Sequence, residues 1–350
     1  MSKILILGGT GAMGEHLVNL LSKTENEVYV TSRKQRQPFG NVRYIQGNAH
    51  EFPFLEATLK GGYDVIVDFM AYGTEEFKTK HLLFLNSCKQ YVFLSSSRAY
   101  ADSKPPITED SPLLVDVCKD EEYMATDEYA LAKGREENIL RTSGKSNWTI
   151  IRPYITYSEQ RLQLGVLEKE VWLYRALHDR TIVFSDDIAD KYTTLTYGQD
   201  VARGIAAVMG NKASLGQAFH ITTSASIKWS DVLEIYLEEL EGILGKKPKL
   251  LMLKKTHRLA NSGKWQVIYD RYYDRRFNNS NINTIMHTDD FVLPEEGLRR
   301  CIRAFCSHPV FRAINWNEQV LLDKMAGERA KRNEFASVKA WIKYLIHRYK

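Results

Sequence analysis

Hydrophobic and polar positions form two alternating kinds of pattern along the first 150 residues of this chain. Short, nearly unbroken apolar runs predict strands at 4–7, 27–31, 42–46, 64–71, 91–95 and 148–152. Amphipathic stretches between them predict helices at 15–23, 54–60, 75–89 and 127–142. Apolar strands that alternate with helices are typical of a parallel sheet covered on both faces. The pattern therefore predicts an α/β fold built on a doubly wound parallel sheet.

Glycines follow the first predicted strand at a regular spacing, Gly8, Gly11 and Gly14. Gly8 permits a tight turn, Gly11 lets backbone N–H groups approach a pyrophosphate, and Gly14 lets the next helix lie close to the strand. The N-terminus of that helix offers N–H donors and a positive dipole end to an anion. The segment predicts a dinucleotide site, with cofactor contacts from Gly8, Thr10, Gly11, Ala12, Met13 and Gly14.

The end of the second predicted strand bears on the choice of cofactor. An NAD site usually has Asp or Glu there, which binds the ribose 2′-hydroxyl. This chain has Ser32, Arg33 and Lys34 instead, and cations suit a 2′-phosphate. The sequence favours NADP, with NAD as the alternative if Arg33 and Lys34 are ordinary loop charges.

A Tyr-x-x-x-Lys pattern occurs twice, at Tyr100–Lys104 and at Tyr129–Lys133. Lys104 runs directly into two prolines, which cannot continue a helix. Tyr129 begins a helical stretch for which Thr126 is the expected N-cap. A spacing of four places the Tyr129 phenol and the Lys133 ammonium on one helix face.

The chemistry uses that proximity. An ammonium beside a phenol favours the phenolate, and such a phenol can give a proton to a carbonyl as hydride arrives, or take one from a hydroxyl as hydride leaves. The third participant, after the phenol and the ammonium, should be a hydroxyl at the carboxyl end of a strand, where Ser95, Ser96 and Ser97 stand. The set predicts a dinucleotide-dependent oxidoreductase.

With these residues the chain resembles the extended short-chain dehydrogenases/reductases, the group of nucleotide-sugar epimerases, dehydratases and reductases. The resemblance spans about 1–300 and is strongest up to 160. Its motifs lie at 8–14, 64–68, 93–100, 129–133, 152–154, 200–202 and 215–221. It implies a Rossmann fold and a catalytic triad of Ser96, Tyr129 and Lys133, with Ser97 in reserve.

The resemblance also implies binding roles. Lys133 would bond the nicotinamide ribose, Pro153 and Tyr154 would flank the nicotinamide, and Asn48 would bond adenine where the family has Asp. Ala71 falls in the family's contact segment after the fourth strand, although the usual His-x-Ala-Ala is absent. The family's pyrophosphate-binding Arg has no clean counterpart, so we expect substrate contacts from Lys191, Arg275 or Arg276. A charged surface turn is the alternative for the two arginines.

These features predict an NAD(P)-dependent enzyme that acts on a nucleotide-activated sugar. Reduction of a keto sugar is the favoured reaction, because an NADP preference suits net reduction. A nucleotide-sugar epimerase with tightly bound NAD is the first alternative. A non-catalytic redox sensor or RNA-associated protein is the alternative from another class.

Composition adds little to this picture. Hydrophobic residues make up 44% and charged residues 26% of the 350, as in ordinary globular proteins. The four cysteines lack metal-ligand spacing, so we expect no metal site and a reducing, cytoplasmic setting. The sequence shows no signal-peptide pattern and no apolar segment long enough to span a bilayer. We also expect no nucleic-acid partner.

The domain expectation follows from where the alternation breaks down, after residue 157. A strand at 217–222 and a helix at 229–244 are the clearest later elements. We expect a dinucleotide-binding domain at 1–160 with returning segments at about 193–225. A substrate-binding lid should comprise 161–192 and 226–300, and 301–350 should form a basic helical extension.

The last fifty residues carry ten Lys and Arg against four Asp and Glu. Val338, Ile342, Leu345 and Tyr349 share one helical face, which we expect to pack on its own subunit. A membrane-surface or acidic-partner helix is the alternative.

The resemblance implies a homodimer formed by the helix at 75–89 and the Tyr-Lys helix. Phe77, Leu82 and Leu85 would offer the apolar contact area on the first of these helices.

Overall fold

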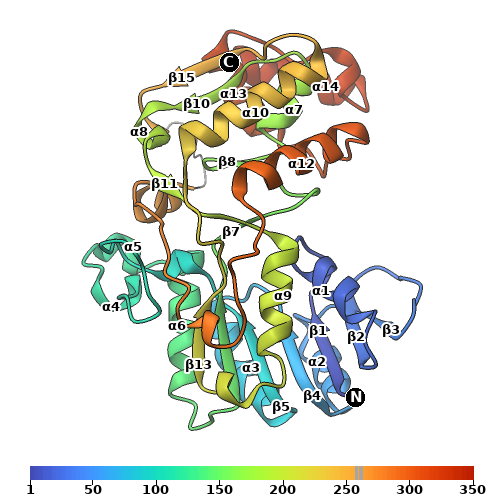
Figure 1. The fold of residues 1–350 in the computed structure, drawn as a ribbon. Coiled ribbons are helices and arrows are strands. Elements are labelled where there is room, and N and C mark those ends of the chain that lie inside the picture. The colour runs from blue at the N-terminus through green and yellow to red at the C-terminus, as the bar shows by residue number, and fades with distance from the viewer. Residues whose placement is uncertain (257–258, 260–262) are drawn as a thin grey trace. The chain divides into compact units, whose positions relative to one another are not determined.

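The computed structural model describes residues 1–256, 259 and 263–350 of the chain. The chain forms two compact units (Figure 1). The first unit comprises 1–158, 194–226 and 275–294, and the second comprises 159–193, 227–274 and 295–350. The segment 275–294, expected in the lid, belongs to the first unit because Asn279 and Asn281 donate hydrogen bonds to the carbonyls of Thr222 and Ala218.

A seven-stranded parallel sheet forms the centre of the first unit. Its order is β13 (Gln217–His220), β6 (Trp148–Arg152), β5 (Cys88–Leu94), β4 (Tyr63–Asp68), β1 (Lys3–Leu7), β2 (Glu27–Ser32) and β3 (Val42–Gln46). A separate parallel pair joins β7 (Ile155–Tyr157) to β12 (Leu195–Tyr197). The strand order reverses between β1 and β4, so the predicted doubly wound α/β sheet is confirmed.

Helices cover both faces of this sheet (Figure 1). They are α1 (Gly14–Leu21), α2 (Phe52–Leu59), α3 (Thr74–Asn86), α6 (Tyr129–Arg141) and α9 (Gly198–Val208). The short helices α4 (Leu114–Val117) and α5 (Glu121–Met124) lie outside this layer, and α4 packs on α6. Short 3₁₀ turns are η1 (Ser97–Ala99), η2 (Lys212–Ser214) and η5 (Ile282–Thr284).

Alternate residues of β1 show how the two faces are filled. Ile4 and Ile6 pack with α1 and α9 in one apolar core, and Leu5 and Leu7 pack with α2, α3 and α6 in the other. Successive side chains of a strand point to opposite faces. An unbroken apolar strand therefore indicated a sheet buried on both sides.

Some predicted boundaries were wrong, for local reasons. The strand predicted to reach residue 71 ends at Asp68, whose carboxylate accepts a hydrogen bond from the Met70 N–H and turns the chain. The predicted helix at 75–89 ends at Asn86, because the chain then pairs with β4 as β5. The N-cap of α6 is Glu128, not Thr126: the Glu128 carboxylate accepts from the Ala130 N–H.

The second unit is built from small sheets and helices. Its strands are β8 (Gln163–Leu164), β9 (Leu167–Glu168), β10 (Ile182–Ser185), β11 (Tyr192–Thr193), β14 (Ile227–Lys228) and β15 (Leu250–Leu253). Its helices are α7 (Trp172–Leu177), α8 (Asp186–Ala189), α10 (Trp229–Leu244), α11 (Lys264–Gln266), α12 (Pro294–Ser307), α13 (Trp316–Ala326) and α14 (Val338–Tyr349), with short turns η4 (Val267–Arg271) and η6 (Arg332–Glu334). The helix predicted at 229–244 matches α10.

A buried charge cluster fastens α13 into this unit. Asp323, fully buried, forms ion pairs with Arg175 of α7 and with Arg180 in the turn between α7 and β10. The segment 301–350 is therefore part of the second unit.

The expected packing face of the last helix was wrong. Tyr344 is buried and Leu345 packs beside it, but Val338, Ile342 and Tyr349 are exposed. In the part of the chain that the structure describes, no helix is long and apolar enough to cross a bilayer.

Candidate active site at the carboxyl edge of the sheet

The glycine loop after β1 has the geometry that a dinucleotide requires. Gly8 has φ +69°, and a Cβ on Gly14 would lie 2.6 Å from the backbone carbon of Gly9. A Cβ on Gly11 would meet no atom within 4 Å, so this position faces open space. Met13 offers no side-chain cap to α1. The loop therefore fits a pyrophosphate, with close helix packing behind it and space in front.

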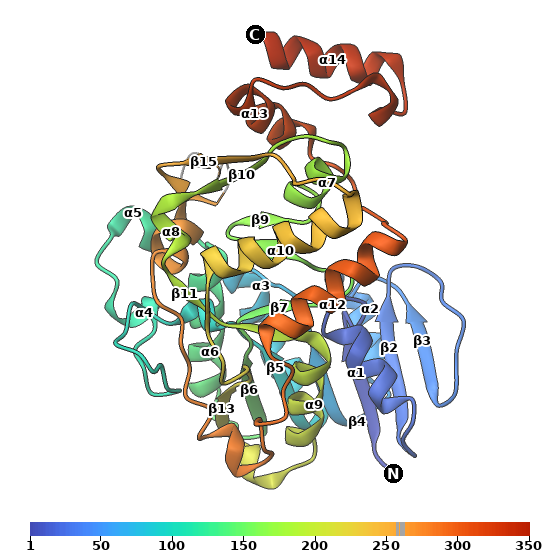
Figure 2. The same cartoon turned by 45° about the horizontal axis from the view of Figure 1, so that its top comes forward.

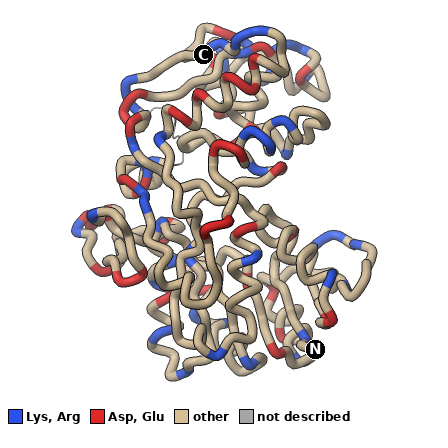
Figure 3. The backbone as a smooth tube through the Cα atoms, in the orientation of Figure 1, with Lys and Arg blue, Asp and Glu red and all other residues tan. Residues whose placement is uncertain are grey.

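The end of β2 presents cations to solvent. The Ser32 hydroxyl donates to the Lys34 carbonyl and accepts from the Lys34 N–H, which forms a tight turn. Arg33 and Lys34 are exposed, and the Arg36 guanidinium lies 5.8 Å from the Tyr44 ring centroid. Figure 3 shows these positive positions along the segment between β2 and β3. Residues 33–40 contain no Asp or Glu, so this turn holds no carboxylate that a 2′-phosphate would meet.

Other expected cofactor contacts lie along the same edge of the sheet. Asn48 is half-buried after β3, where its side chain accepts from the His50 N–H. Ala71 is exposed after β4, and Pro153 and Tyr154 are buried after β6. The carboxyl ends of parallel strands meet at one edge, where ligands bind in open α/β sheets.

The three serines after β5 have different surroundings. Ser95 donates to Glu137 at 2.5 Å, and Ser97 donates to the Arg152 carbonyl at 2.8 Å. Ser96 accepts from the Arg98 N–H at 3.2 Å. Among the described residues Ser96 is the one of the three whose hydroxyl donates to no protein group. Ser97, the reserve candidate for the triad, is fully buried, and its hydroxyl already donates to a backbone carbonyl.

Tyr129 is the first residue of α6, and the residue as a whole is 41% exposed. Lys133 Nζ lies 6.0 Å from the centroid of that ring, and the Arg98 guanidinium lies 5.4 Å from it. Arg98 follows Ser96 in η1, and it also pairs with Glu128 at 2.6 Å. The structure thus brings the end of β5 and the start of α6 together, with an accessible phenol beside two cations.

Lys133 has an acidic neighbour that the sequence reasoning missed. Its Nζ lies 2.9 Å from Oε2 of Glu136, and both side chains are buried. Oε1 of Glu136 is buried with no hydrogen-bond partner among the described residues. Burial raises the pKa of Glu136 to about 7; Lys133 opposes this shift and Asp68 adds to it. The signal in the sequence was an acid three residues after the lysine on a helix.

Asp68 is the second buried acid of this region. It accepts hydrogen bonds from the hydroxyls of Tyr72 at 3.0 Å and Tyr91 at 2.7 Å. Burial raises the pKa of Asp68, although these bonds and the charge of Lys133 act against it. The ammonium of Lys133 therefore favours the ionised form of two buried carboxyl groups, those of Asp68 and Glu136.

Glu137, the next residue of α6, behaves in the opposite way. Burial alone would raise its pKa, but Arg152, together with the Ser95 hydrogen bond and the charge of Arg141, holds the pKa below its usual value. The Arg152 guanidinium donates to both Glu137 oxygens, at 2.9 and 2.5 Å. Arg152 also donates to the Tyr100 hydroxyl at 2.8 Å. Tyr100 is fully buried and its pKa is raised by burial, so it is a structural residue and Tyr129 is the accessible phenol.

The candidate substrate contacts differ in accessibility. Arg275 is fully buried and donates to the carbonyls of Tyr100 and Ala101. The prediction that Arg275 contacts a substrate phosphate was therefore wrong. Arg276 is half-buried in the first unit and Lys191 is half-buried in the second.

The expected dimer contacts on α3 are also mostly internal. Phe77 and Leu85 are buried in the core, and Leu82 is exposed.

Residues 4–222 match the model of the NAD dependent epimerase/dehydratase family. No curated protein sequence matches the chain.

Several solved structures share the fold at low sequence identity. The dTDP-glucose 4,6-dehydratase of Bacillus anthracis with NAD is 16% identical, with a TM-score of 0.67 over 88% of this chain and 97% of the other. The UDP-glucuronic acid 4-epimerase of Bacillus cereus, with UDP-glucuronic acid and NAD, is 17% identical, with a TM-score of 0.64 over 86% and 99%. The Bordetella bronchiseptica enzyme WbmH with NAD⁺ is 14% identical, with a TM-score of 0.67 over 89% and 100%.

The family model covers more than half of the chain, including the glycine loop, the serines after β5 and the Tyr-Lys helix. A non-catalytic sensor or RNA-associated protein is therefore set aside. The chain is an extended short-chain dehydrogenase/reductase and belongs to the NAD dependent epimerase/dehydratase family.

Proposed function

We propose that the protein reduces a keto group of a nucleotide-activated sugar, with NADP(H) as the preferred cofactor. The observation that supports the chemistry is the accessible Tyr129 phenol, flanked by Lys133 and next to the strand end that carries Ser96. The observation that supports the cofactor preference is the exposed cationic turn of Arg33 and Lys34 after β2.

The cofactor would be held by residues of the first unit. The loop from Gly8 to Gly14 would bind the pyrophosphate, Arg33 and Lys34 the 2′-phosphate, and Asn48 the adenine. Lys133, Ala71, Pro153 and Tyr154 would lie along the nicotinamide half. When bound, the nicotinamide supplies or accepts hydride.

The chain's own residues would handle the proton. Tyr129 would donate its phenolic proton to the sugar carbonyl oxygen, while the free hydroxyl hydrogen of Ser96 bonds the same oxygen. The O–H bond of Tyr129 breaks and an O–H bond of the sugar forms, and a solvent proton then restores the phenol. The ammonium of Lys133 stabilises the transient phenolate.

Epimerisation with a retained cofactor is the second candidate. It uses the same residues in both directions, first to remove and then to return a proton. It is favoured by the fold shared with the UDP-glucuronic acid 4-epimerase.

Two measurements separate the candidates. Mass spectrometry of the purified protein identifies any retained nucleotide, and NADPH consumption is followed with UDP- and dTDP-linked keto sugars. Net consumption with NADPH supports the proposal. Retained NAD, with interconversion of sugar epimers and no net cofactor turnover, would replace it with epimerisation.

The catalytic assignment has its own test. Tyr129→Phe removes the proton and keeps the ring, so we expect turnover to fall by about 10²–10⁴-fold with cofactor binding nearly unchanged. Tyr29→Phe, at a half-buried tyrosine on β2, is the matched control. Normal turnover of Tyr129→Phe on the true substrate would remove the assignment.

Substrate contacts and assembly complete the proposal. Arg276 of the first unit is our candidate for the nucleotide phosphates, with Lys191 of the second unit as a separate alternative. Alanine at the residue that binds the phosphates should raise KM more than it lowers kcat. A homodimer remains our proposal, with Leu82 as the exposed apolar residue of α3. Analytical ultracentrifugation tests it, and a monomer at micromolar concentration would contradict it.

A further inference from the structure

The last helix, α14, carries an apolar face that the protein does not cover. Val338, Ile342, Ile346 and Tyr349 are 53%, 48%, 46% and 67% exposed. Their spacing of four, four and three residues keeps them within about 80° of one another around the helix, at 3.6 residues per turn. These four residues are called the apolar face below.

A different side of α14 anchors the helix to the second unit. The Tyr344 hydroxyl donates to Asp323 at 2.5 Å and accepts from the Ala330 N–H at 2.7 Å. Arg348 donates to the Glu328 carbonyl at 2.7 Å. Phe335, Trp316 and Trp341 pack around Tyr344. Figure 2 shows α14 lying beside α13. The helix is thus fixed by this contact, and the apolar face is not part of it.

Cations border the apolar face on its other side. Lys339, Lys343 and the C-cap residue Lys350 are exposed. With a rotation of about 100° per residue, these three lysines lie next to the apolar face around the helix axis. Residues 335–350 contain no Asp or Glu. The order around the helix is therefore docked side, apolar face and cationic stripe, where the cationic stripe means these three lysines.

We propose that α14 binds an anionic lipid surface, with the apolar face inserted among the acyl chains and the cationic stripe on the headgroups. An amphipathic helix that lies in a membrane interface has an apolar face bordered by Lys and Arg. The proposal concerns peripheral binding and is independent of the proposed catalytic function.

The charge pattern argues against the other occupants. A second copy of α14 would bring two cationic stripes together with no acidic residue in 335–350 to pair them. A nucleic acid would satisfy the lysines and leave the apolar face in water. An acidic protein groove could match both faces, and it is an outcome of the test below.

The size of the electrostatic contribution can be stated as a fold-change. Each Lys close to an anionic surface strengthens binding about fivefold. Reversing two lysines should therefore weaken binding to anionic vesicles by at least about 25-fold. Salt that shortens the Debye length should weaken it as well.

The experiment uses the full-length protein and sedimentation with large unilamellar vesicles. One set of vesicles is phosphatidylcholine alone, and the other contains phosphatidylglycerol as a third of the lipid. We expect binding to the anionic vesicles, little binding to the neutral ones, and release at high salt.

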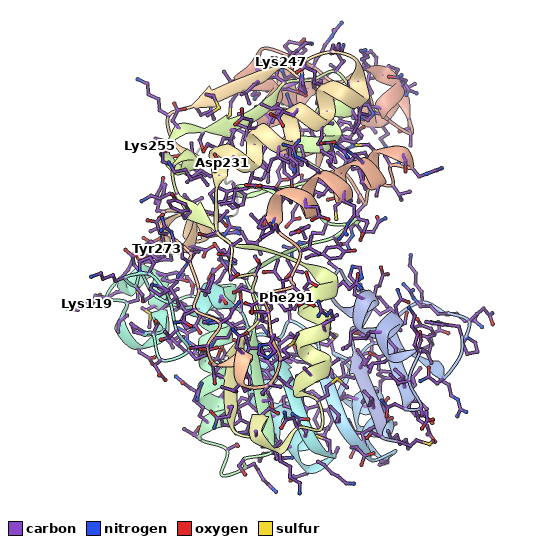
Figure 4. The ribbon with its side chains drawn as sticks, in the orientation of Figure 1. Lys119, Asp231, Lys247, Lys255, Tyr273 and Phe291 are labelled. Carbon is purple, nitrogen blue, oxygen red and sulfur yellow. The ribbon has the colours of Figure 1, made fainter. Side chains whose placement is uncertain are left out.

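Three variants assign the binding to α14. Ile342→Ser with Ile346→Ser changes the apolar face, and Lys339→Glu with Lys343→Glu changes the cationic stripe. Lys119→Glu with Lys145→Glu, at exposed lysines of the first unit, is the matched control; Figure 4 labels Lys119 on the segment between α4 and α5. Circular dichroism and cofactor binding show whether each variant is folded. The first two variants should lose binding and the control should keep it.

The results decide the proposal either way. Absence of binding to both vesicle sets overturns it, including the case in which α14 mediates dimers or captures an acidic protein. Equal binding to neutral and anionic vesicles overturns the headgroup assignment. Binding that survives both α14 variants shows that another surface is responsible.

Discussion

Replacement of Glu136 by Gln tests whether a buried carboxyl beside the candidate catalytic lysine weakens the fold at neutral pH. Gln has nearly the shape of a protonated Glu and does not titrate. Its amide oxygen can still accept from Lys133 Nζ, which lies 2.9 Å from Glu136 Oε2. The variant therefore mimics the protonated state at every pH.

The magnitude follows from the pKa of Glu136, which burial raises from 4.5 to about 7. A raised carboxyl pKa means that the folded protein binds the proton more tightly than the unfolded chain. The resulting stability is fully present below pH 4.5 and is lost as pH rises through about 7. The loss is about 1.4 kcal/mol per pH unit, or about 3 kcal/mol in all.

We therefore expect Glu136→Gln to be about as stable as the parent near pH 4.5, and more stable by up to about 3 kcal/mol at pH 8. If instead the ion pair with Lys133 dominates, removal of one partner should destabilise the fold by about 3–5 kcal/mol. The two effects have opposite signs at pH 8, so the measurement decides between them.

The assay is urea unfolding at several pH values from about 4.5 to 8, followed by circular dichroism and tryptophan fluorescence. Coincident transitions are required, because the chain has two units. The matched control is Glu137→Gln on the same helix. The pKa of Glu137 is held low by Arg152 against burial, so that variant should be destabilised at every pH in this range. A Glu136→Gln variant that is less stable than the parent at pH 8 would refute the reasoning.

Three further predictions concern the dinucleotide loop, the cofactor and the second unit. Gly14→Ala should destabilise the protein by about 1–3 kcal/mol, because its Cβ would meet the Gly9 backbone. Gly11→Ala, which meets no protein atom, should keep urea stability and weaken cofactor binding in calorimetry. Arg33→Asp should reverse or flatten the preference for NADP(H); equal affinities of the parent for NADP(H) and NAD(H) would contradict the assignment. Asp323→Asn leaves Arg175 and Arg180 buried with reduced compensation, so thermal unfolding of the second unit should show a loss of about 3–5 kcal/mol; an unchanged melting temperature would contradict this.

The glycine loop, the parallel sheet and the Tyr-x-x-x-Lys helix could be predicted from the sequence, because each depends on neighbours in the chain. The φ of +69° at Gly8 needs a residue without Cβ. The apolar runs of β1, β4 and β5 need helices on both sides. These requirements are local, and a single sequence displays them.

The choice among similar side chains was a matter of tertiary structure. Residues Ser95, Ser96 and Ser97 are alike in sequence, yet Glu137 and the Arg152 carbonyl occupy two of the hydroxyls. Tyr100 and Arg275 carry the right chemistry and are buried.

The same distinction applies to the last helix. Periodicity located its apolar residues and its lysines, but it could not say which face would meet α13. Only the folded chain placed Tyr344 on Asp323 and left Ile342 and Ile346 in solvent. Burial depends on what other segments bring to a side chain, and contacts between distant segments are not encoded in the spacing of residues along one helix.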